Sequence, residues 1–285
     1  MILNNCINKT TRMVKIGLLG VGHLGKIHLK CLQNIETVTV TGFYDPNDEA
    51  AQHILRTYPQ LQRYDSLSSI FEVSDAIDIV TPTITHFDLA AAAIQKGKHV
   101  FIEKPLTRTP AEAGMLAKLA KEKGVKVQVG YVERFNPAFL SIQNIPLNPL
   151  FIEAHRLAMF NPRGTDVSVV LDLMVHDLDL ILNIVKAPLT SVEASGVAVV
   201  SRSPDIANAR LEFQNGAVAN LTASRISMKQ MRKLRLFQKD AYISPDLLDK
   251  QTQIIQLFGD FYDNLLAFLL CPAVKSIHRY FVLVF

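Results

Sequence analysis

The sequence predicts an α/β protein in two parts: a parallel sheet with helices on both faces, then an α+β part with an open, mostly antiparallel sheet. Between Val14 and about Tyr131, short apolar segments alternate with helical ones, which is typical of a parallel sheet. The first apolar segment runs into a glycine-rich turn and then into a helix. After about residue 132, one amphipathic helix is followed by a run of strands, which favours antiparallel pairing.

Apolar periodicity and turn residues place the individual elements. The strands of the first part are expected at 14–19, 38–44, 77–81, 98–102 and 125–131, and its helices at 23–33, 48–57, 86–96 and 110–123. The second part is expected to contain a strand at 150–159, a helix at 168–185 and strands at 190–201, 206–214, 217–226, 231–238 and 251–258. Asn215-Gly216 predicts a type I′ hairpin between two of these strands. We place the domains at residues 13–131 and 132–285.

Composition limits the class of protein. A chain of 285 residues is long enough for two domains, and 49% hydrophobic with 20% charged residues is ordinary for a soluble globular protein. The net charge of +4 is small, and the densest basic cluster, 229–235, alternates with apolar residues. We therefore expect a solvated strand face there and no nucleic-acid partner. No stretch is long and apolar enough to span a membrane.

The cysteines and the N-terminus indicate the compartment. Cys6, Cys31 and Cys271 lack metal-ligand spacing and cannot all pair, so we expect a reduced, cytoplasmic protein. Residues 1–12 lack the apolar region of a signal peptide and predict a floppy extension, with Met13 as an alternative start.

The glycine-rich turn is the strongest local signal. Gly20 permits a tight turn, Gly22 lets a pyrophosphate approach the backbone, and Gly25 lets the following helix pack on the strand. The turn also contains His23 and Leu24, and the first amides of the helix would hold the phosphates. Asp45 ends the second strand, 20 residues after Gly25, where a carboxylate accepts a ribose hydroxyl and repels a 2′-phosphate. This pattern predicts NAD rather than NADP as the cofactor.

Two further segments contain groups that could move a proton. Glu103-Lys104-Pro105 follows a strand of the first part, where ligands bind in open α/β sheets, so Lys104 could exchange a proton with a substrate hydroxyl. The alternative is an ordinary exposed lysine. Asp172 and His176 are four residues apart on the helix 168–185, so the carboxylate could orient the imidazole as a general base.

Alternatives for this helix are a structural Asp–His contact or a metal site. A metal is not expected, because no H-E-x-x-H and no second histidine lie nearby. Asp177 and Asp179 are expected to face solvent or to cap neighbouring loops. The remaining histidines, including His28, form no constellation in the sequence.

Polar residues at the predicted domain junction could contact a substrate. Arg134 and Asn136, in GYVERFNP, could bind an anionic or polyhydroxylated molecule. Alternatively, Arg134 could pair with Glu133 or another acid. His86 follows Thr81-Pro82-Thr83 and either lines a nicotinamide pocket or is simply a polar residue at a helix start.

The order GVGHLG, TPT-x-TH, EKP and Asp-x-x-x-His resembles the Gfo/Idh/MocA family of sugar and inositol dehydrogenases over about 14–258. The resemblance implies a Rossmann domain and an open sheet often used for dimerisation, hence a homodimer or homotetramer. It implies that Lys104 and His176 form the proton-handling pair, with Asp172 in support. The residues implied to contact the cofactor are Gly20, Gly22, His23, Leu24, Gly25, Asp45, Thr81, Pro82, Thr83, His86, Glu103 and Lys104.

GYVERFNPA and VSVVLDLMVHDLDLIL resemble the family's branch of UDP-N-acetylglucosamine 3-dehydrogenases. This implies oxidation of the sugar C3 hydroxyl of UDP-N-acetylglucosamine, or a related UDP-sugar, to a ketone with reduction of NAD. A partner aminotransferase would then serve lipid A or another surface glycan. Substrate contacts are expected from Arg134, Asn136 and Arg163. The alternatives are a dehydrogenase of a free sugar, inositol or sugar acid, and a non-catalytic NAD-sensing regulator, which would need neither Lys104 nor His176.

The C-terminal segment departs from the family pattern. GDFYDNLLAFLLCPAVKSIHRYFVLVF is unusually apolar and does not resemble the family's usual ending. We expect a truncated or frame-shifted terminus, which would affect the stability of the second domain.

Overall fold

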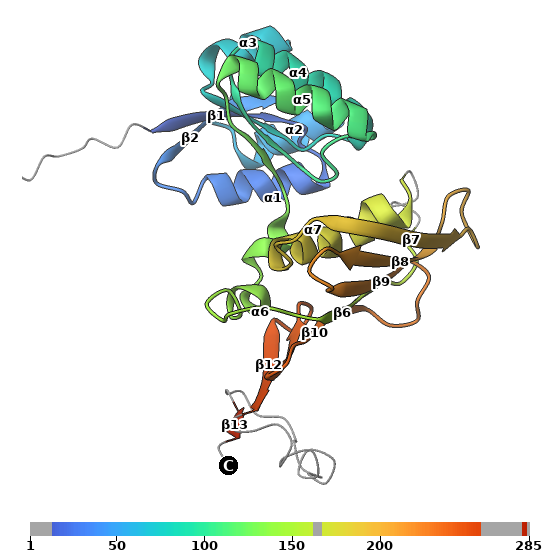
Figure 1. Ribbon diagram of the computed structural model, residues 1–285. Coiled ribbons are helices and arrows are strands. Elements are labelled where there is room, and N and C mark those ends of the chain that lie inside the picture. The colour runs from blue at the N-terminus through green and yellow to red at the C-terminus, as the bar shows by residue number, and fades with distance from the viewer. Residues whose placement is uncertain (1–12, 162–166, 258–280, 284–285) are drawn as a thin grey trace, which may run out of the picture. The chain divides into compact units, whose positions relative to one another are not determined.

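The computed structural model describes residues 13–161, 167–257 and 281–283 (Figure 1). Contacts divide the chain into two units, 1–130 and 131–285, which are described separately below. The expectations for the N-terminal extension, for Arg163 and for most of the apolar C-terminal segment concern residues outside these described ranges. Within the described ranges, no helix combines the length and the apolar character that crossing a membrane requires.

Unit 1 is built on a parallel sheet with the strand order β2-β1-β3-β4-β5. Its strands are β1 (Val14–Leu19), β2 (Val38–Tyr44), β3 (Ala76–Ile79), β4 (His99–Ile102) and β5 (Val127–Val129). Its helices are α1 (His23–Leu32), α2 (Asp48–Thr57), α3 (Leu67–Val73), α4 (His86–Gln95) and α5 (Pro110–Lys123), with the 3-10 helix η1 (Thr83–Thr85). The predicted parallel sheet is confirmed; α3 was not predicted.

The helices of unit 1 cover both faces of its sheet. Leu18 and Phe43 pack with residues of α1 and α2 on one face. Leu19 and Ile79 pack with residues of α3, α4 and α5 on the other face. Because both faces are buried, the strands are nearly continuous apolar runs that end at one edge of the sheet.

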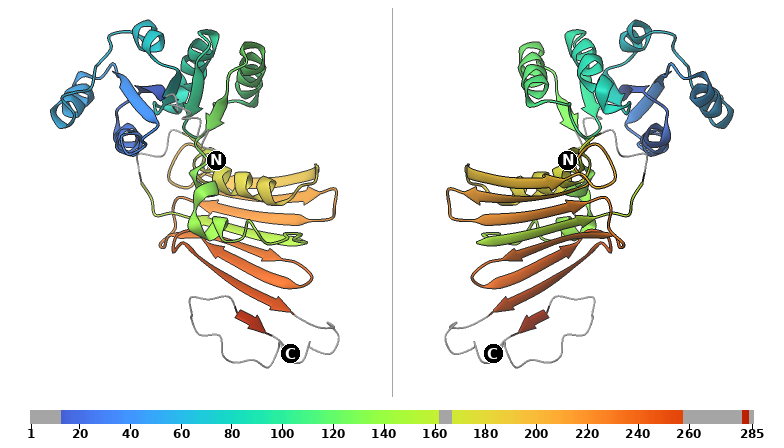
Figure 2. Two further views of the ribbon diagram at one scale, coloured as in Figure 1. Left: turned by 90° about the vertical axis from the view of Figure 1, so that its left-hand side faces the viewer. Right: turned by 90° about the vertical axis from the view of Figure 1, so that its right-hand side faces the viewer.

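Unit 2 contains an open sheet with the strand order β13-β12-β11-β10-β6-β9-β8-β7. Figure 2 shows these strands lying side by side. The pairs β6–β9 and β12–β13 are parallel and the others are antiparallel, which confirms the predicted mostly antiparallel sheet. The strands are β6 (Phe151–Leu157), β7 (Leu189–Val197), β8 (Ile206–Phe213), β9 (Val218–Ser224), β10 (Met231–Phe237), β11 (Ala241–Asp246), β12 (Gln251–Leu257) and β13 (Phe281–Leu283).

The helical segments of unit 2 are η2 (Val132–Phe135), α6 (Pro137–Leu140), a π-helical turn η4 (Val170–Met174) and α7 (Val175–Ile184). Burial alternates along β6, so one face of the sheet is buried. Leu180 and Ile181 of α7 belong to the same core as Ile152 and Leu234 of the sheet. The predicted helix therefore covers one face, but it begins with a wide turn rather than as a regular α-helix.

The hairpin between β8 and β9 is confirmed, but its turn type is not. A type I′ turn needs positive φ at both central residues. Gly216 has φ 82°, whereas Asn215 is not among the described non-glycine residues with positive φ. Phe213 and Ala217 are joined by a backbone hydrogen bond, so the loop is longer than predicted.

Candidate active site

The glycine-rich turn between β1 and α1 has the geometry that a bound dinucleotide requires. Gly20 has φ 90°, and a Cβ there would lie 2.9 Å from the carbonyl oxygen of Val80. A Cβ at Gly25 would lie 2.2 Å from the carbonyl oxygen of Gly20, so turn and helix pack closely. A Cβ at Gly22 would meet nothing within 4 Å among the described residues, and the first turn of α1 contains no acidic residue. The open side of Gly22 and the helix amides therefore fit phosphate groups.

Asp45 lies directly after β2 and is tied to the glycine-rich turn. Its Oδ2 accepts a hydrogen bond from the Val21 amide at 2.8 Å, and its Oδ1 accepts one from the Asn47 amide at 2.8 Å. A carboxylate has about four acceptor positions, so acceptor capacity remains for ribose hydroxyls. The residues around Asp45 therefore fit the ribose of NAD.

Arg63, 18 positions after Asp45, also approaches this position. Its Nη2 donates to the carbonyl oxygen of Asp45 at 3.0 Å and to the carboxylate of Asp48 at 2.7 Å. An arginine near this aspartate can accommodate the 2′-phosphate of NADP. Here the Asp48 carboxylate already pairs with the guanidinium.

His86 joins two of the predicted site segments. Its ring is buried, with Nδ1 2.9 Å from the carbonyl oxygen of Pro105 and Nε2 2.9 Å from that of Thr81. The hydroxyl of Thr85 also contacts that of Thr81 at 2.7 Å. The structure thus gives His86 a bridging role between the Thr81-Pro82-Thr83 turn and the segment that contains Lys104.

Glu103 holds the backbone of Lys104. Its Oε2 accepts a hydrogen bond from the Lys104 amide at 3.1 Å, and its Oε1 lies 3.1 Å from Nε2 of His28. A Cβ at Gly130 would lie 2.7 Å from the same Oε1, so this glycine permits the carboxylate to fit. Lys104 itself is half-buried, which differs from the expectation of an ordinary exposed lysine.

The candidate base His176 and its partner Asp172 lie on two different kinds of helical turn. Asp172 belongs to the π-helical turn η4, and His176 belongs to the first turn of α7. Both side chains are half-buried. Wide π turns are frequent at functional sites. The orientation of His176 by Asp172 stays a prediction.

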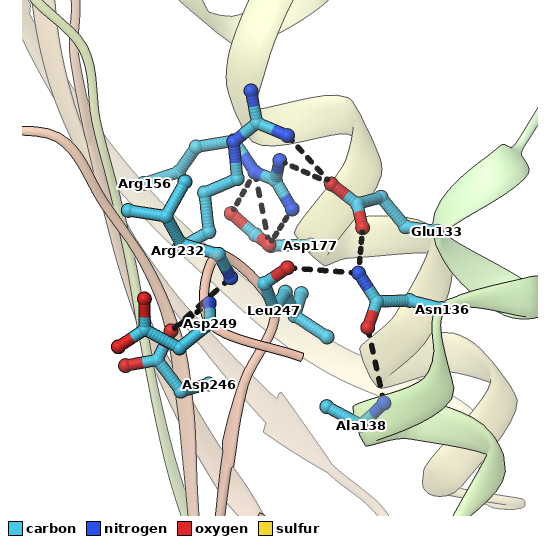
Figure 3. Close-up of polar contacts among 10 residues, drawn as sticks. Glu133, Asn136, Ala138, Arg156, Asp177, Arg232, Asp246, Leu247 and Asp249 are labelled. Carbon is cyan, nitrogen blue, oxygen red and sulfur yellow. Dashed lines mark hydrogen bonds and ion pairs between the residues drawn. The ribbon is translucent and has the colours of Figure 1, made fainter. Parts of the chain in front are cut away.

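A buried charge cluster anchors the helix that contains His176 (Figure 3). Arg156 of β6 is 3% exposed; its Nε and Nη2 donate to Asp177, and its Nη1 donates to Glu133 at 2.9 Å. Asp177 is also 3% exposed, so the expectation that it faces solvent was wrong. Arg156 was not among the predicted site residues, because its partners are 21 and 23 positions away.

The electrostatics of this cluster follow from burial and pairing. Burial raises the pKa of Asp177 above its ordinary value, although Arg156 opposes this shift. Burial alone would lower the pKa of Arg156, but the charges of Asp177 and Glu133 raise it overall. Arg232 adds a second guanidinium 3.4 Å from Glu133. The cluster fixes η2 and α7 on the sheet.

Arg134 pairs with an acid, as the alternative expectation for this residue stated, and this acid is Asp179. Its guanidinium donates to both oxygens of Asp179, at 2.7 Å from Nε and 2.5 Å from Nη2. It also lies 5.7 Å from the centroid of the Tyr131 ring. Its side chain is 41% exposed, so contact with a substrate remains open to it.

Asn136 has a structural role, and its contact with substrate stays a prediction. Its Nδ2 donates to Glu133 at 3.0 Å and to the carbonyl oxygen of Leu247 at 2.9 Å. Its Oδ1 accepts from the Ala138 amide and caps α6 (Figure 3). Both amide protons are therefore committed within unit 2. In the described parts of the chain, no group of three potential metal ligands gathers.

The comparisons with known proteins agree with these features. Residues 14–131 match an oxidoreductase family with an NAD-binding Rossmann fold, and residues 153–243 match the Gfo/Idh/MocA C-terminal domain. A UDP-N-acetylglucosamine 3-dehydrogenase of Acidithiobacillus ferrooxidans is 38% identical over 85% of this chain and 76% of its own length. The chain belongs to the Gfo/Idh/MocA family. This confirms the predicted oxidoreductase with an NAD-binding Rossmann domain.

A solved structure of this relative and a second family member show how the similarity is distributed. A solved structure of the Acidithiobacillus ferrooxidans enzyme superposes with a TM-score of 0.81, at 38% identity, over 86% of this chain and 80% of that one. The scyllo-inositol 2-dehydrogenase (NAD(+)) of Bacillus subtilis is 30% identical over 75% of this chain and 68% of its own length.

In this Gfo/Idh/MocA chain, the predicted site residues of unit 1 gather at one edge of the sheet. The glycine-rich turn follows β1, Asp45 follows β2, Thr81 follows β3, and Glu103-Lys104 follows β4. Because these strands are parallel, their carboxyl ends lie at the same edge, where open α/β sheets bind ligands.

Proposed function

We propose that this chain is an NAD-dependent dehydrogenase that oxidises the C3 hydroxyl of UDP-N-acetylglucosamine to a ketone. The observation that supports this most is the 38% identity, over 85% of the chain, to a relative named for that reaction. The second candidate is oxidation of a free polyol, which is favoured by the 30% identity to the scyllo-inositol 2-dehydrogenase.

The cofactor contacts follow from the sheet edge of unit 1. The open side of Gly22 and the amides of α1, beside His23 and Leu24, hold the pyrophosphate, and Asp45 accepts the ribose hydroxyls. The nicotinamide side of the site is formed by Thr81, Pro82, Thr83 and Glu103, with Lys104 beside them. NAD, when bound, supplies the acceptor for the hydride that leaves C3.

The chain's own task in the reaction is to take the proton of the hydroxyl. As the hydride leaves the carbon, the oxygen must lose its proton for a ketone to form. Lys104 and His176 are the two candidates for this general base, and Asp172 supports the imidazole of His176. Glu103 and His86 set the backbone from which Lys104 acts.

Arginines recognise the anionic part of the substrate. Arg134 is half-exposed, and its guanidinium is oriented by Asp179. The pair with Asp179 uses Nε and Nη2, which leaves Nη1 to contact an anionic group such as a diphosphate. Arg134, Asn136 and Arg163 are the proposed substrate contacts, and the amide protons of Asn136 are already used within unit 2.

We also propose a pathway partner and an oligomeric state for this enzyme. A 3-keto sugar nucleotide is a substrate for an aminotransferase, so we propose such a partner in the same pathway, for lipid A or another surface glycan. We also propose a homodimer or homotetramer in the cytoplasm. Size-exclusion chromatography with light scattering tests the oligomeric state.

The test of the function is product identification. Purified protein is incubated with NAD and UDP-N-acetylglucosamine, and hydroxylamine traps any ketone as an oxime. Parallel reactions contain free N-acetylglucosamine, scyllo-inositol or glucose. We expect NADH and a trapped 3-keto sugar nucleotide in the first reaction alone. Turnover of scyllo-inositol without turnover of the sugar nucleotide would favour the second candidate. Tight NAD binding without turnover of any substrate would contradict both.

A further inference from the structure

A histidine of α1, the helix that follows the glycine-rich turn, connects two buried carboxylates in unit 1. Nδ1 of His28, on α1, lies 3.0 Å from Oδ2 of Asp78 on β3. Its Nε2 lies 3.1 Å from Oε1 of Glu103, at the end of β4. The three side chains are 17%, 5% and 11% exposed. The ring of Phe101 packs against the imidazole edge to face, with centroids 5.7 Å apart.

This geometry favours the protonated form of His28. A neutral imidazole has one N–H and one lone pair, so a carboxylate on each side would leave one of them facing the lone pair. Only the imidazolium donates to both carboxylates. Burial on its own would lower the pKa of His28, but the hydrogen bonds to Asp78 and Glu103 raise it to about 10.

Asp78 and Glu103 depend on this cation in different ways. Oδ1 of Asp78 has no hydrogen-bond partner within the described part of the chain, and burial raises the pKa of this carboxyl, although His28 opposes the shift. Glu103 uses its second oxygen to accept the Lys104 amide. The imidazolium therefore compensates the charge of the side chain that holds the backbone of Lys104.

We propose that His28 is a positioning residue for the dehydrogenase reaction: its imidazolium holds the Glu103 carboxylate in place, and thereby fixes the strand end that contains Lys104. This role rests on the proposed function only where catalysis is measured. The protonation of His28 is a property of unit 1 that can be measured without any substrate.

The substitution of His28 has to be compensated, because two buried carboxylates without a cation could prevent folding. The double variant His28→Gln/Asp78→Asn removes one positive and one negative charge together. It keeps polar side chains at both positions but leaves Glu103 without a cation. His53→Gln is the matched control, since His53 is exposed on α2.

The first measurement is the histidine NMR spectrum of the whole protein labelled with ¹⁵N-histidine, with the His28→Gln/Asp78→Asn spectrum assigning the His28 signals. We expect both ring nitrogens of His28 to remain protonated from pH 6 to about pH 9. A neutral His28 at pH 7.5 would overturn the proposal, whatever the substrate of the enzyme is.

The second measurement is the pH dependence of kcat for the wild type, the double variant and His53→Gln. When His28 loses its proton near pH 10, Glu103 loses the cation that holds it, so kcat of the wild type and of His53→Gln should fall between about pH 8 and 10. We expect kcat of the double variant to be lower at about pH 7 and not to show this fall. Superimposable profiles for all three proteins would overturn the positioning role. If no substrate is turned over, the proposed dehydrogenase function fails, and the NMR result alone decides on His28.

Discussion

Lys104 and His176 are the residues on which the proposed proton transfer depends. A general base contributes about 10² to 10⁴ in rate, so Lys104→Met or His176→Asn should lower kcat by at least ~100-fold if the residue accepts the proton. Steady-state kinetics and thermal unfolding of each variant check this. Lys96→Met, at the exposed end of α4, is the control and should behave as the wild type. Near-wild-type rates in both catalytic variants would refute the assignment.

We expect Asp45 and Asp48 to set the choice between NAD and NADP. A hydrogen bond to a charged group contributes about 1.5–3 kcal/mol, so Asp45→Asn should weaken NAD binding by at least ~10-fold. Asp45→Asn/Asp48→Asn also removes the acid that pairs with Arg63, so this double variant should gain affinity for NADP. Calorimetric titration with both cofactors measures these changes, with the exposed Asp65→Asn as control. No gain in NADP affinity would argue against a role for Arg63.

The charge of His28 also predicts how stability depends on pH. The folded-state pKa of about 10 lies above the ordinary value of 6.5, so the stabilisation is fully present below pH 6.5 and is lost as the pH rises towards 10. Between these values, the unfolding free energy should fall by up to about 1.4 kcal/mol per pH unit. Urea unfolding at several pH values, compared with His28→Gln/Asp78→Asn, measures this slope. Equal slopes in the two proteins would contradict it.

At the scale of elements, Arg156 connects β6, η2 and α7. Removing one partner of a buried ion pair costs about 3–5 kcal/mol, so Arg156→Met should lower the unfolding free energy by that amount. Arg235 of β10 provides the control, because it pairs with Glu153 at 3.0 Å while 37% exposed. Arg235→Met should cost less than about 1 kcal/mol. Urea denaturation measures both, and equal losses would show that the Arg156 cluster is not an anchor.

Elements with strong periodicity were predictable, and those with mixed signals were not. The strands and helices around the glycine-rich turn follow the expected alternation. β11 was missed because Pro245 lies inside it, and proline usually argues against a strand. α3 was missed because it is short, although Ser66 accepts a hydrogen bond from the Ser69 amide and caps it. The π-helical turn before α7 has no recognised signal in its residues.

Site residues that belong to one short sequence motif were predictable. The glycines and Asp45 lie as expected because a short segment determines their geometry. His28 was missed because Asp78 and Glu103 are 50 and 75 positions away, and only the sheet order brings them together. Asp177 was assigned to solvent for the same reason: its partner Arg156 is on a different element.

At the scale of the whole molecule, each unit contains one of the two candidate bases. Unit 1 contains Lys104 and the residues proposed to contact the cofactor, at the carboxyl edge of a parallel sheet. Unit 2 contains His176 on a helix that a buried arginine fixes to the open sheet. Each unit has its own apolar core, so substitutions in one should leave the packing of the other intact.

Hydride transfer from C3 of a sugar nucleotide to NAD can be followed with an isotope label at that carbon. UDP-N-acetylglucosamine with deuterium at C3 is incubated with NAD and the purified protein, with hydroxylamine as the ketone trap, and the NADH formed is analysed by mass spectrometry. We predict one deuterium in the NADH and none left on the trapped sugar. NADH without deuterium, or NADH from scyllo-inositol alone, would contradict the account.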